Sequence, residues 1–518
     1  MAPGRDGTPV GHEVPPGASA TEGLPPAPMR LSDLARAVSD GILVGDADVR
    51  AIAYDSRRVI DGTLFFAMGG TRTDGHDHAG DAVAAGACGL VVERQLDLPV
   101  PQLVVPSVRH AMGPMSALFY GNPATRLATV AVTGTNGKTT TSTVLRECLE
   151  AAGMPAGQIG TVGSWFLDRN LPTSLTTPYA PELHWTLREM ARSGVRAVAV
   201  EASSHGLDQG RLDGIVFDVG IFTNLTREHL DYHGTMERYW LAKASLFEPD
   251  RCRLGIIAVD DRWGRRLAER VDIPVLTFGK SDDADVRYDV VEHGLEGLTV
   301  TVEAADGPAT LRTSLVGAVN AANVTAAYLS ARHLGIPQED VVKGIAAAAA
   351  PPGRFQLVDA GQPFLVVVDY AHTPDALAAL LRTARKIAKG RVSVVLGARG
   401  GRDRGKRPMM GQIAAHADAV YLTTDSPGDE PISQIFRALY QGTLDAGRST
   451  TVVVDPDRRS AITRAVGAAR EGDAVLIVGR GHEQFQHIGD ETVPLDDRVA
   501  ARDAIVATWS DVATGPCA

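Results

Sequence analysis

The sequence has little of several features that mark large classes of proteins. Only four of its 518 residues are cysteine, and these four are scattered without metal-ligand spacing. Such usage suggests no disulfide framework and fits a reducing compartment. No apolar run approaches the length that crosses a bilayer, and the net charge of -11 argues against a nucleic-acid partner. We therefore expect a cytoplasmic protein without a membrane or nucleic-acid partner.

The length of the chain exceeds what one hydrophobic core organises and suggests about three domains. Residues 1–29 are rich in proline and glycine and lack the apolar segment of a signal peptide, so we expect a disordered tail. The sequence patterns then predict an N-terminal domain over 30–125, a central domain over 126–352 and a C-terminal domain over 353–518.

Short apolar strands alternate with helical segments in all three predicted domains. Examples are the runs Ala197–Ala202 and Phe217–Asn224 in the central domain, and FLVVVDY, AVYLTT and DAVLIVG further on. This alternation predicts an α/β protein with parallel-rich sheets covered by helices. Ligands in such sheets bind at the carboxyl ends of the strands, where we expect the functional residues to gather.

The stretch TGTNGKTT, residues 133–140, is the most informative part of the sequence. It follows an apolar strand and opens a helix-like run, which is the setting of a phosphate-binding loop. Glycines allow backbone N–H groups to approach phosphate oxygens, Lys138 can reach the terminal phosphates, and the Thr139 hydroxyl can hold Mg²⁺. The general pattern has a glycine where Val132 stands, so a glycine-rich turn without a ligand is the alternative. Nucleotide binding is the better interpretation.

Acidic and imidazole side chains follow the two neighbouring strands. Glu201 ends one strand, and Asn224 ends the next and leads to His229. Alone, each such residue is more often a cap or a solvated loop residue. Together, beside a phosphate loop, they favour a site for Mg²⁺ and ATP.

Further motifs occur in the order found in the Mur ligase family, and the chain most resembles its MurE type, the UDP-N-acetylmuramoyl-tripeptide synthetases. The resemblance extends from about residue 31 to about residue 510. It rests on the phosphate loop and on DSRRVIDGTLFFAMGG (55–70), EASSHGLDQGR (201–211), NLTREHLDYHG (224–234), YWLAKASLF (239–247), DYAHTPDAL (369–377) and GKRPMMG (405–411).

This resemblance implies an ATP-dependent amide ligase of peptidoglycan precursor synthesis. The carboxylate of a UDP-MurNAc-dipeptide would attack the γ-phosphate of ATP, and a free amino acid would then attack the resulting acyl phosphate. The implied cofactors are ATP and Mg²⁺, and the implied oligomeric state is a monomer. The N-terminal domain would bind the UDP end of the substrate, the central domain would be the P-loop-type ATPase, and the C-terminal domain would be Rossmann-like.

The resemblance also assigns roles to single residues of the nucleotide site. Lys243 stands where the family has a carbamylated lysine (N6-carboxylysine), although a surface lysine would be the ordinary interpretation. The implied metal ligands are Thr139, Glu201, His229 and Lys243. The implied catalytic residues are Lys138, His229, Lys243 and Arg407. The implied ATP-binding residues are Gly134, Thr135, Asn136, Gly137, Lys138, Thr139, Thr140, Asn320, Asn323, Arg354, Asp369 and His372.

The substrate residues are assigned in the same way. Ser56 matches the uridine end of the substrate. The residues that match the muramoyl-peptide positions are Thr176, Thr177, Ser203, Gln209 and Arg211. The residues that match the positions for the incoming amino acid are Asp425, Gly428, Gly479 and Glu483.

The segment DSPGDEP, residues 425–431, departs from the family pattern. Diaminopimelate-adding enzymes carry an arginine where Gly428 stands, and both they and the lysine-adding variants carry an asparagine where Ser426 stands. The missing guanidinium predicts weak use of meso-diaminopimelate and preference for an amino acid that is smaller or lacks the distal carboxylate. Arg402, Arg404 and Arg480 are alternative sources of that guanidinium.

Two further alternatives stay open. One is a MurE-like ligase recruited to a specialised peptide pathway, and the other is a catalytically silent nucleotide-binding paralogue. Intact Lys138, Glu201, Lys243 and His372 favour an enzyme. A ligase similar to folylpolyglutamate synthase would share the loop but lack the DSRR-type first domain.

Overall fold

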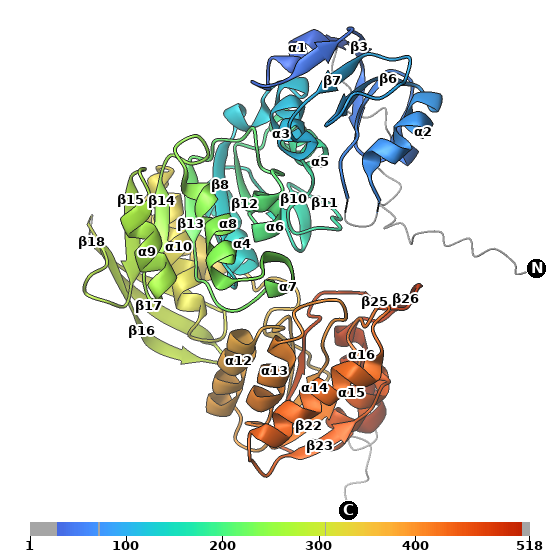
Figure 1. Ribbon diagram of the computed structural model, residues 1–518. Helices are drawn as coiled ribbons and strands as arrows, with labels where there is room; N and C mark the ends of the chain where they lie inside the picture. The colour runs from blue at the N-terminus through green and yellow to red at the C-terminus, as the bar shows by residue number, and fades with distance from the viewer. Residues whose placement is uncertain (1–27, 71–72, 306, 510–518) are drawn as a thin grey trace, which may run out of the picture.

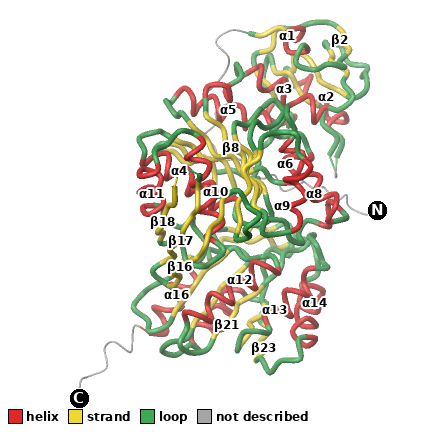
Figure 2. Tube along the Cα trace, turned by 90° about the vertical axis from the view of Figure 1, so that its left-hand side faces the viewer, coloured by secondary structure: helices red, strands yellow, loops and turns green. Residues whose placement is uncertain are grey.

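Three α/β domains follow one another in the computed structural model, which describes residues 28–70, 73–305 and 307–509. Figure 1 shows the N-terminal domain at the top, the central domain below it and the C-terminal domain at the bottom. The same order is seen in the turned view of Figure 2. The α/β fold class predicted from the sequence is confirmed. Within the described residues, no helix has both the length and the apolar character needed to cross a membrane.

The N-terminal domain is built on a five-stranded sheet of order β2-β7-β6-β5-β4, in which only β2 runs antiparallel to its neighbour. Met29 pairs with Val49, so the first strand begins one residue inside the predicted tail, the rest of which, apart from Pro28, lies outside the described residues. The elements, with two short 3₁₀ helices, are β1 (Met29–Arg30), α1 (Leu31–Ala35), β2 (Ile42–Val44), β3 (Asp48–Val49), β4 (Ala51–Ala53), η1 (Ser56–Arg58), β5 (Thr63–Phe66), η2 (Gly75–His78), α2 (Ala79–Ala84), β6 (Ala87–Val92), β7 (Gln102–Val104) and α3 (Val108–Phe119).

The central domain has an eleven-stranded sheet of order β11-β10-β9-β12-β8-β13-β14-β15-β16-β17-β18, parallel from β9 to β16. Its strands are β8 (Ala128–Thr133), β9 (Ala156–Gly160), β10 (Gly163–Phe166), β11 (Arg169–Leu171), β12 (Ala197–Glu201), β13 (Val219–Phe222), β14 (Gly255–Ala258), β15 (Val275–Gly279), β16 (Val286–Gly294), β17 (Gly297–Ala304) and β18 (Gly307–Thr313). Its helices are η3 (Pro123–Arg126), α4 (Lys138–Ala151), α5 (Ala180–Arg192), α6 (Ser204–Asp208), α7 (Leu230–His233), α8 (Met236–Ala244), η4 (Ser245–Phe247), α9 (Arg262–Arg270), α10 (Asn320–His333) and α11 (Gln338–Ala347).

The C-terminal domain has a six-stranded sheet of order β19-β20-β24-β21-β22-β23, parallel except at β19, and a separate hairpin, β25–β26. Two hydrophobic clusters cover its two faces. The elements are β19 (Gln356–Leu357), β20 (Leu365–Asp369), α12 (Pro374–Ile387), β21 (Val392–Leu396), α13 (Lys406–Ala414), β22 (Ala419–Leu422), α14 (Ile432–Asp445), β23 (Thr451–Val454), α15 (Arg458–Gly467), β24 (Ala474–Val478), β25 (Phe485–Ile488), β26 (Glu491–Pro494) and α16 (Asp497–Trp509).

The register of three buried central strands brings the predicted polar residues to one edge of the sheet. Glu201 of β12 pairs with Val132 of β8, and Phe222 of β13 pairs with Thr133. The chain therefore leaves β8, β12 and β13 at the same level and on the same side. Carboxyl ends of parallel strands are the usual ligand-binding edge of such sheets.

Candidate active site

The phosphate loop, residues 134–137, connects β8 to the first turn of α4 and depends on its two glycines. Gly134 and Gly137 have φ values of +143° and +91°, in the region that favours glycine. A Cβ atom on Gly134 would lie 1.9 Å from the Thr223 hydroxyl, and one on Gly137 would lie 2.3 Å from Asn323 Oδ1. The backbone therefore packs closely against two other elements and leaves the N-terminal N–H groups of α4 without a side-chain cap. An uncapped helix N-terminus with this loop is suited to bind phosphate.

Lys138 folds back over the loop and donates hydrogen bonds to the carbonyl oxygens of Gly134 and Thr135, at 2.9 and 3.0 Å. Burial lowers its pKa, while the charge of Glu201 acts to raise it. The side chain is thus held beside the loop, where the predicted interaction with phosphate requires it.

Glu201 connects the phosphate loop to the neighbouring strand end. Its carboxylate is fully buried and accepts hydrogen bonds from the Thr139 hydroxyl at 3.1 Å and from the Thr161 hydroxyl and backbone N–H at 2.9 and 3.0 Å. The Thr161 hydroxyl also contacts that of Thr176 at 3.1 Å. Thr161, which follows β9, was missed by sequence reasoning because no motif marks it.

Lys243 of α8 is buried beside the phosphate loop, with 1% of its surface exposed. Its Nζ donates to the Gly134 carbonyl oxygen at 2.8 Å and lies 4.9 Å from the ring centre of Tyr239. Burial and the charge of Lys138 lower the pKa of Lys243 well below its usual value. The interpretation as a surface lysine is therefore wrong.

His229 has a left-handed backbone conformation, with φ of +55°, and its Nδ1 is buried without a hydrogen-bond partner among the described residues. Burial strongly lowers its pKa, and nearby His205 and Lys243 add to this effect. Across the described residues, no group of three or more His, Cys, Asp or Glu side chains is placed to hold a metal ion. The predicted metal ligands include a hydroxyl, a carboxylate, an imidazole and a lysine. Of these, Thr139 and Glu201 are in direct contact.

The predicted adenosine residues lie on two domains. Asn323 of α10 packs against Gly137 and donates to Asn320 at 2.9 Å. In the C-terminal domain, Asp369 accepts hydrogen bonds from the backbone N–H groups of Phe355 and Ala371, which fixes the loop that carries His372. Burial lowers the pKa of His372 well below its usual value, and the charge of Lys406 adds to this effect.

Polar contacts among the described residues join the C-terminal domain to the central site. Arg354 Nη2 donates to the Thr139 hydroxyl at 3.2 Å. Further contacts are ion pairs: Lys406 Nζ lies 2.9 Å from Glu228 Oε1, and Arg227 Nε lies 3.2 Å from Asp403 Oδ2.

Arg407 is placed differently from the sequence prediction. It is 2% exposed, and both terminal nitrogens of its guanidinium donate to Glu430 at 2.8 Å. A further hydrogen bond goes to the Arg399 carbonyl oxygen at 3.0 Å. These contacts tie two loops of the C-terminal domain together and do not bring Arg407 to the phosphate loop.

The predicted muramoyl-peptide residues form one connected group beside Glu201. Thr177 donates to the Glu201 carbonyl oxygen at 2.7 Å and lies 2.9 Å from the Ser203 hydroxyl. Arg211 donates to the Thr177 carbonyl oxygen at 2.9 Å and to Gln209 Oε1 at 2.7 Å. The structure thus brings these four predicted residues together, and their role in binding the muramoyl-peptide stays a prediction. Ser56 lies apart from it, in the N-terminal domain at the start of η1.

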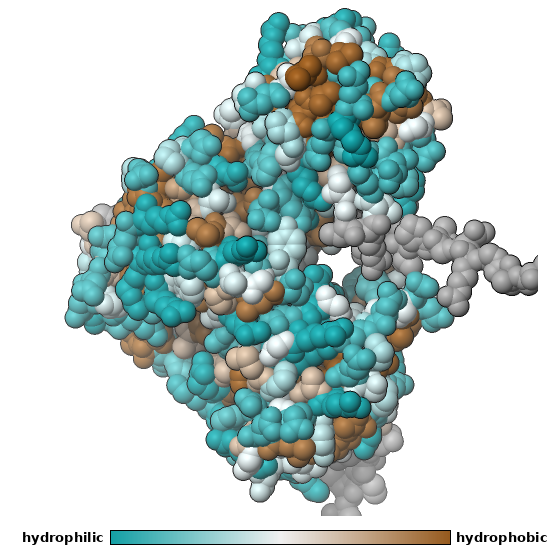
Figure 3. Space-filling view, in the orientation of Figure 1, coloured by the Kyte–Doolittle hydropathy of each residue, from teal (hydrophilic) through white to brown (hydrophobic). Residues whose placement is uncertain are grey.

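A recess lies between the N-terminal and C-terminal domains, on one side of the central domain. In Figure 3 the outline of the molecule is indented on the right, between the N-terminal domain above and the C-terminal domain below. Figure 1 places α6, α7 and the β25–β26 hairpin on this side.

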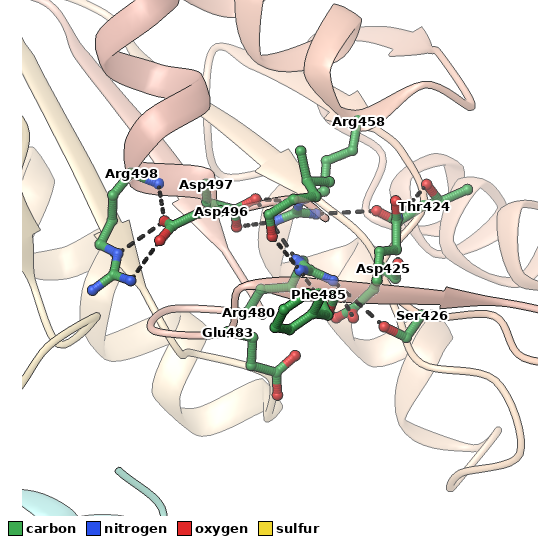
Figure 4. A network of polar contacts seen from close by, with 12 residues as sticks. Thr424, Asp425, Ser426, Arg458, Arg480, Glu483, Phe485, Asp496, Asp497 and Arg498 are labelled. Carbon is green, nitrogen blue, oxygen red and sulfur yellow. Dashed lines mark hydrogen bonds and ion pairs between the residues drawn. The ribbon is translucent and has the colours of Figure 1, made fainter. Parts of the chain in front are cut away.

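A buried ionic network holds the segment 425–431, which departs from the family pattern and follows β22 (Figure 4). Arg458 and Asp497 are both fully buried and lie 2.7 Å apart. Arg480, also 0% exposed, donates to the carbonyl oxygens of Phe485 and Leu495 at 2.9 and 2.8 Å and to the Ser426 hydroxyl at 3.4 Å. The network thus connects the segment after β22, the loop after β24 and the start of α16.

Two glycines shape the same region. Gly479 has φ of +107°, and a Cβ there would lie 3.1 Å from Asp425 Oδ2. Gly428 has φ of +53°, exchanges backbone hydrogen bonds with the β25–β26 hairpin, and has nothing within 4 Å of a Cβ position.

These features define the class of the protein: a three-domain α/β protein with a phosphate-loop motif where the central and C-terminal domains meet. Known proteins have the same organisation. Family models match for the Mur ligase middle domain over residues 132–331, the glutamate ligase domain over 353–481 and the Mur ligase catalytic domain over 48–120.

Full-length relatives agree with these matches. A UDP-N-acetylmuramoyl-L-alanyl-D-glutamate–2,6-diaminopimelate ligase of Geobacillus thermodenitrificans is 42% identical over 469 residues, which cover 89% of this chain and 96% of the relative. A ligase of the same name from Streptomyces coelicolor is 40% identical over 500 residues, covering 93% and 99%. A solved structure with this name has a TM-score of 0.63 and 34% identity, covering 89% and 95%. The chain belongs to the Mur ligase family.

Replacement of Arg458 by leucine should destabilise the protein by about 3–5 kcal/mol, because it leaves the buried Asp497 carboxylate without its partner. Urea denaturation measures this loss. The matched control is Arg459→Leu, which removes an exposed arginine paired with exposed Asp503 and should change stability by less than about 0.5 kcal/mol. Equal effects of the two substitutions would contradict this account.

Proposed function

We propose that the protein is an ATP-dependent ligase that joins a free amino acid to UDP-N-acetylmuramoyl-L-alanyl-D-glutamate. The observation that carries this proposal is the position of Glu201. Its carboxylate is hydrogen-bonded to Thr139 of the phosphate-binding element and, through Thr161, is linked to Thr176 on the substrate side. The terminal phosphate of ATP and the carboxylate of the peptide substrate can therefore meet at one buried point.

The reaction needs charge neutralisation more than it needs an acid or a base. A carboxylate oxygen attacks the γ-phosphorus, a P–O bond forms and ADP leaves. The amine of the amino acid then attacks the acyl carbon, loses a proton and releases phosphate. Because carboxylate and triphosphate repel each other, catalysis depends on alignment and on positive charge. Lys138 and Arg354 supply cations at the loop, and closure of the C-terminal domain would exclude water.

Mg²⁺ fits the residues that the resemblance assigns to it. Glu201 and the Thr139 hydroxyl offer the oxygen ligands that this ion prefers, and the buried Nδ1 of His229 has no partner among the described residues. When bound, the ion would neutralise phosphate charge.

Lys243 is suited to carbamylation. A neutral amine is the form that attacks CO₂, and the pKa of Lys243 is lowered well below its usual value by burial and by Lys138. The nitrogen lone pair forms a bond to the carbon of CO₂ and a proton is released, which leaves an anion. The resulting anion would attract neighbouring Lys138, whose charge disfavours the protonated amine of Lys243.

The neighbourhood of Lys138, Glu201 and Lys243 also bears on the two alternatives. A silent paralogue would not need a buried lysine with a lowered pKa beside an intact phosphate loop, so the site supports an enzyme. The altered segment at Gly428 keeps the specialised pathway as a second candidate. ADP release with UDP-N-acetylmuramoyl-L-alanyl-D-glutamate and a panel of amino acids tests the ligase proposal directly, and no release with any of them would contradict it.

Lys138→Ala should reduce ADP formation by on the order of a thousandfold, because a positioned cation is removed from the transferring phosphoryl group. The melting temperature should hardly change. The control is Lys343→Ala, at an exposed lysine of α11, which should keep full activity. Near-normal ADP formation by a well-folded Lys138→Ala protein would rule out the assigned role.

Lys243→Ala should be inactive and should partly recover activity when short-chain carboxylates are added, since these replace the missing anion. Intact-mass measurement of the unsubstituted protein should show the mass of one added CO₂, and isotope-labelled bicarbonate should introduce its label. Lys243→Arg keeps a cation but cannot form the carbamate, so it should be inactive without rescue. An active preparation that carries no modification at Lys243 would refute this role.

A further inference from the structure

Glu182, in the first turn of α5, connects the central domain to the N-terminal domain. Its Oε1 accepts hydrogen bonds from the Tyr54 hydroxyl and from Arg58 Nη1, each at 2.9 Å. The two donors stand on either side of Ser56 in the sequence, the residue assigned to the uridine end of the substrate. Figure 1 shows α5 beside α3, where the two domains meet. One carboxylate of the central domain therefore holds both flanks of a predicted substrate motif.

The two contacts of Glu182 differ in their surroundings. The side chains of Arg58 and Glu182 are 38% and 32% exposed, so water screens their ion pair, and such pairs contribute little energy. Burial, by contrast, raises the pKa of Tyr54, and the charge of Glu182 adds to this effect. A hydrogen bond to a carboxylate in such a place is worth more than a surface ion pair. The Tyr54 hydroxyl is therefore the main link between the two domains at this point.

The ring of Tyr54 also supports the residues assigned to the muramoyl-peptide. It packs on the ring of Tyr179, just before α5, with 4.7 Å between the ring centres. The Arg211 guanidinium in turn lies 4.4 Å from the centre of the Tyr179 ring and donates to the Thr177 carbonyl oxygen at 2.9 Å. Contacts of this kind are stabilising and sensitive to placement. Tyr54 thus has two separable parts, a hydroxyl that bonds to Glu182 and a ring that leads to Arg211.

A second contact between the same two domains follows Arg211 in the sequence. His110 Nδ1 of α3 lies 2.8 Å from Asp213 Oδ2. A Cβ atom on Gly113, further along α3, would lie 2.4 Å from the Asp213 carbonyl oxygen, so the helix and this segment are in close contact. One contact alone would let a domain rotate about it, and two separate contacts restrict that rotation. The N-terminal domain is thus attached both at the start of α5 and at Asp213.

We propose that Glu182 is a positioning residue: through the Tyr54 hydroxyl it sets the N-terminal domain at the spacing at which both ends of one substrate molecule can bind. This inference rests on the proposed ligase function, in which the uridine end is assigned to Ser56 and the muramoyl-peptide end to Arg211 and its neighbours. A ligand held by both domains binds more weakly when the competent arrangement is only partly populated. A ligand held by the central domain alone is indifferent to that arrangement.

The test compares KM and kcat for two substrates. One is UDP-N-acetylmuramoyl-L-alanyl-D-glutamate, and the other is the same muramoyl-dipeptide as its 1-phosphate, which lacks the uridine end. Tyr54→Phe removes the hydroxyl and keeps the ring. It should raise KM for the complete substrate about 10- to 30-fold, the value of one hydrogen bond to a carboxylate, and leave its kcat unchanged. KM for the shortened substrate should not change, and a general loss of stability would not produce this split.

Further variants separate the contacts of Glu182. Glu182→Ala should match Tyr54→Phe, and the double variant should be no worse than Glu182→Ala alone, because both changes remove the same bond. Glu182→Gln keeps an acceptor oxygen and should fall between Glu182→Ala and the unsubstituted protein. Arg58→Ala should change KM by less than about fivefold, as expected of an exposed ion pair. Glu189→Gln, two turns further along α5, is the matched control and should leave the use of both substrates unchanged.

Three results would overturn the inference. The first is an unchanged KM for the complete substrate in a folded Tyr54→Phe protein. The second is an equal rise in KM for both substrates, which would mean a general loss of structure. The third is additive effects of Tyr54→Phe and Glu182→Ala, which would mean that the two residues act independently. If the unsubstituted protein releases no ADP with the complete substrate and any amino acid, the proposed function fails, and the inference with it, before any variant is compared. Should Glu182→Ala not fold, Tyr54→Phe and Glu182→Gln decide.

Discussion

The buried carboxylate of Glu201 is the interaction on which the site depends. It stands at the end of β12, between Thr139 in the first turn of α4 and Thr161, which follows β9. Its position requires close packing, because a Cβ on neighbouring Gly160 would lie 2.1 Å from Glu201 Oε1. A buried carboxylate needs hydrogen bonds or a cation to compensate for lost hydration. The threonine donors meet this need in the structure.

The C-terminal domain completes the site by a small number of charged contacts. Arg354 reaches Thr139, and Lys406 pairs with Glu228 in a region where both side chains are almost fully buried. Such contacts are directional, and each can break and be replaced by another polar contact when the domain moves. A large apolar interface cannot be exchanged in this way. They suit the proposed closure of the C-terminal domain, in which substrates enter before water is excluded.

Much of the architecture could be predicted from the sequence because local patterns determine it. The phosphate loop has its own signature, and the buried strands at 197–201 and 219–222 are short apolar runs that end in polar residues. Parallel pairing then brings Glu201 and Asn224 to one edge without further information. Lys243 was identified only through the resemblance, since nothing in its local sequence distinguishes a buried lysine from a surface one.

The environments of the arginines in the C-terminal domain could not be predicted in the same way. Arg399 and Arg480 lie in loops and Arg407 lies in the first turn of α13. One faces a pair of carboxylates, one is enclosed by backbone carbonyl oxygens, and Arg407 is held by Glu430. These differences depend on contacts between residues far apart in the chain. Thr161 was missed for the same reason, because its role comes from the neighbouring strand.

The central claim is that a carboxylate of the substrate attacks ATP at the point that Glu201 defines. The most direct test follows heavy oxygen placed in the reacting carboxylate of UDP-N-acetylmuramoyl-L-alanyl-D-glutamate through one complete reaction. If an acyl phosphate forms, a labelled oxygen must leave with the inorganic phosphate, and mass spectrometry of that phosphate will find it. Phosphate without label, formed together with the amide product, would contradict this account.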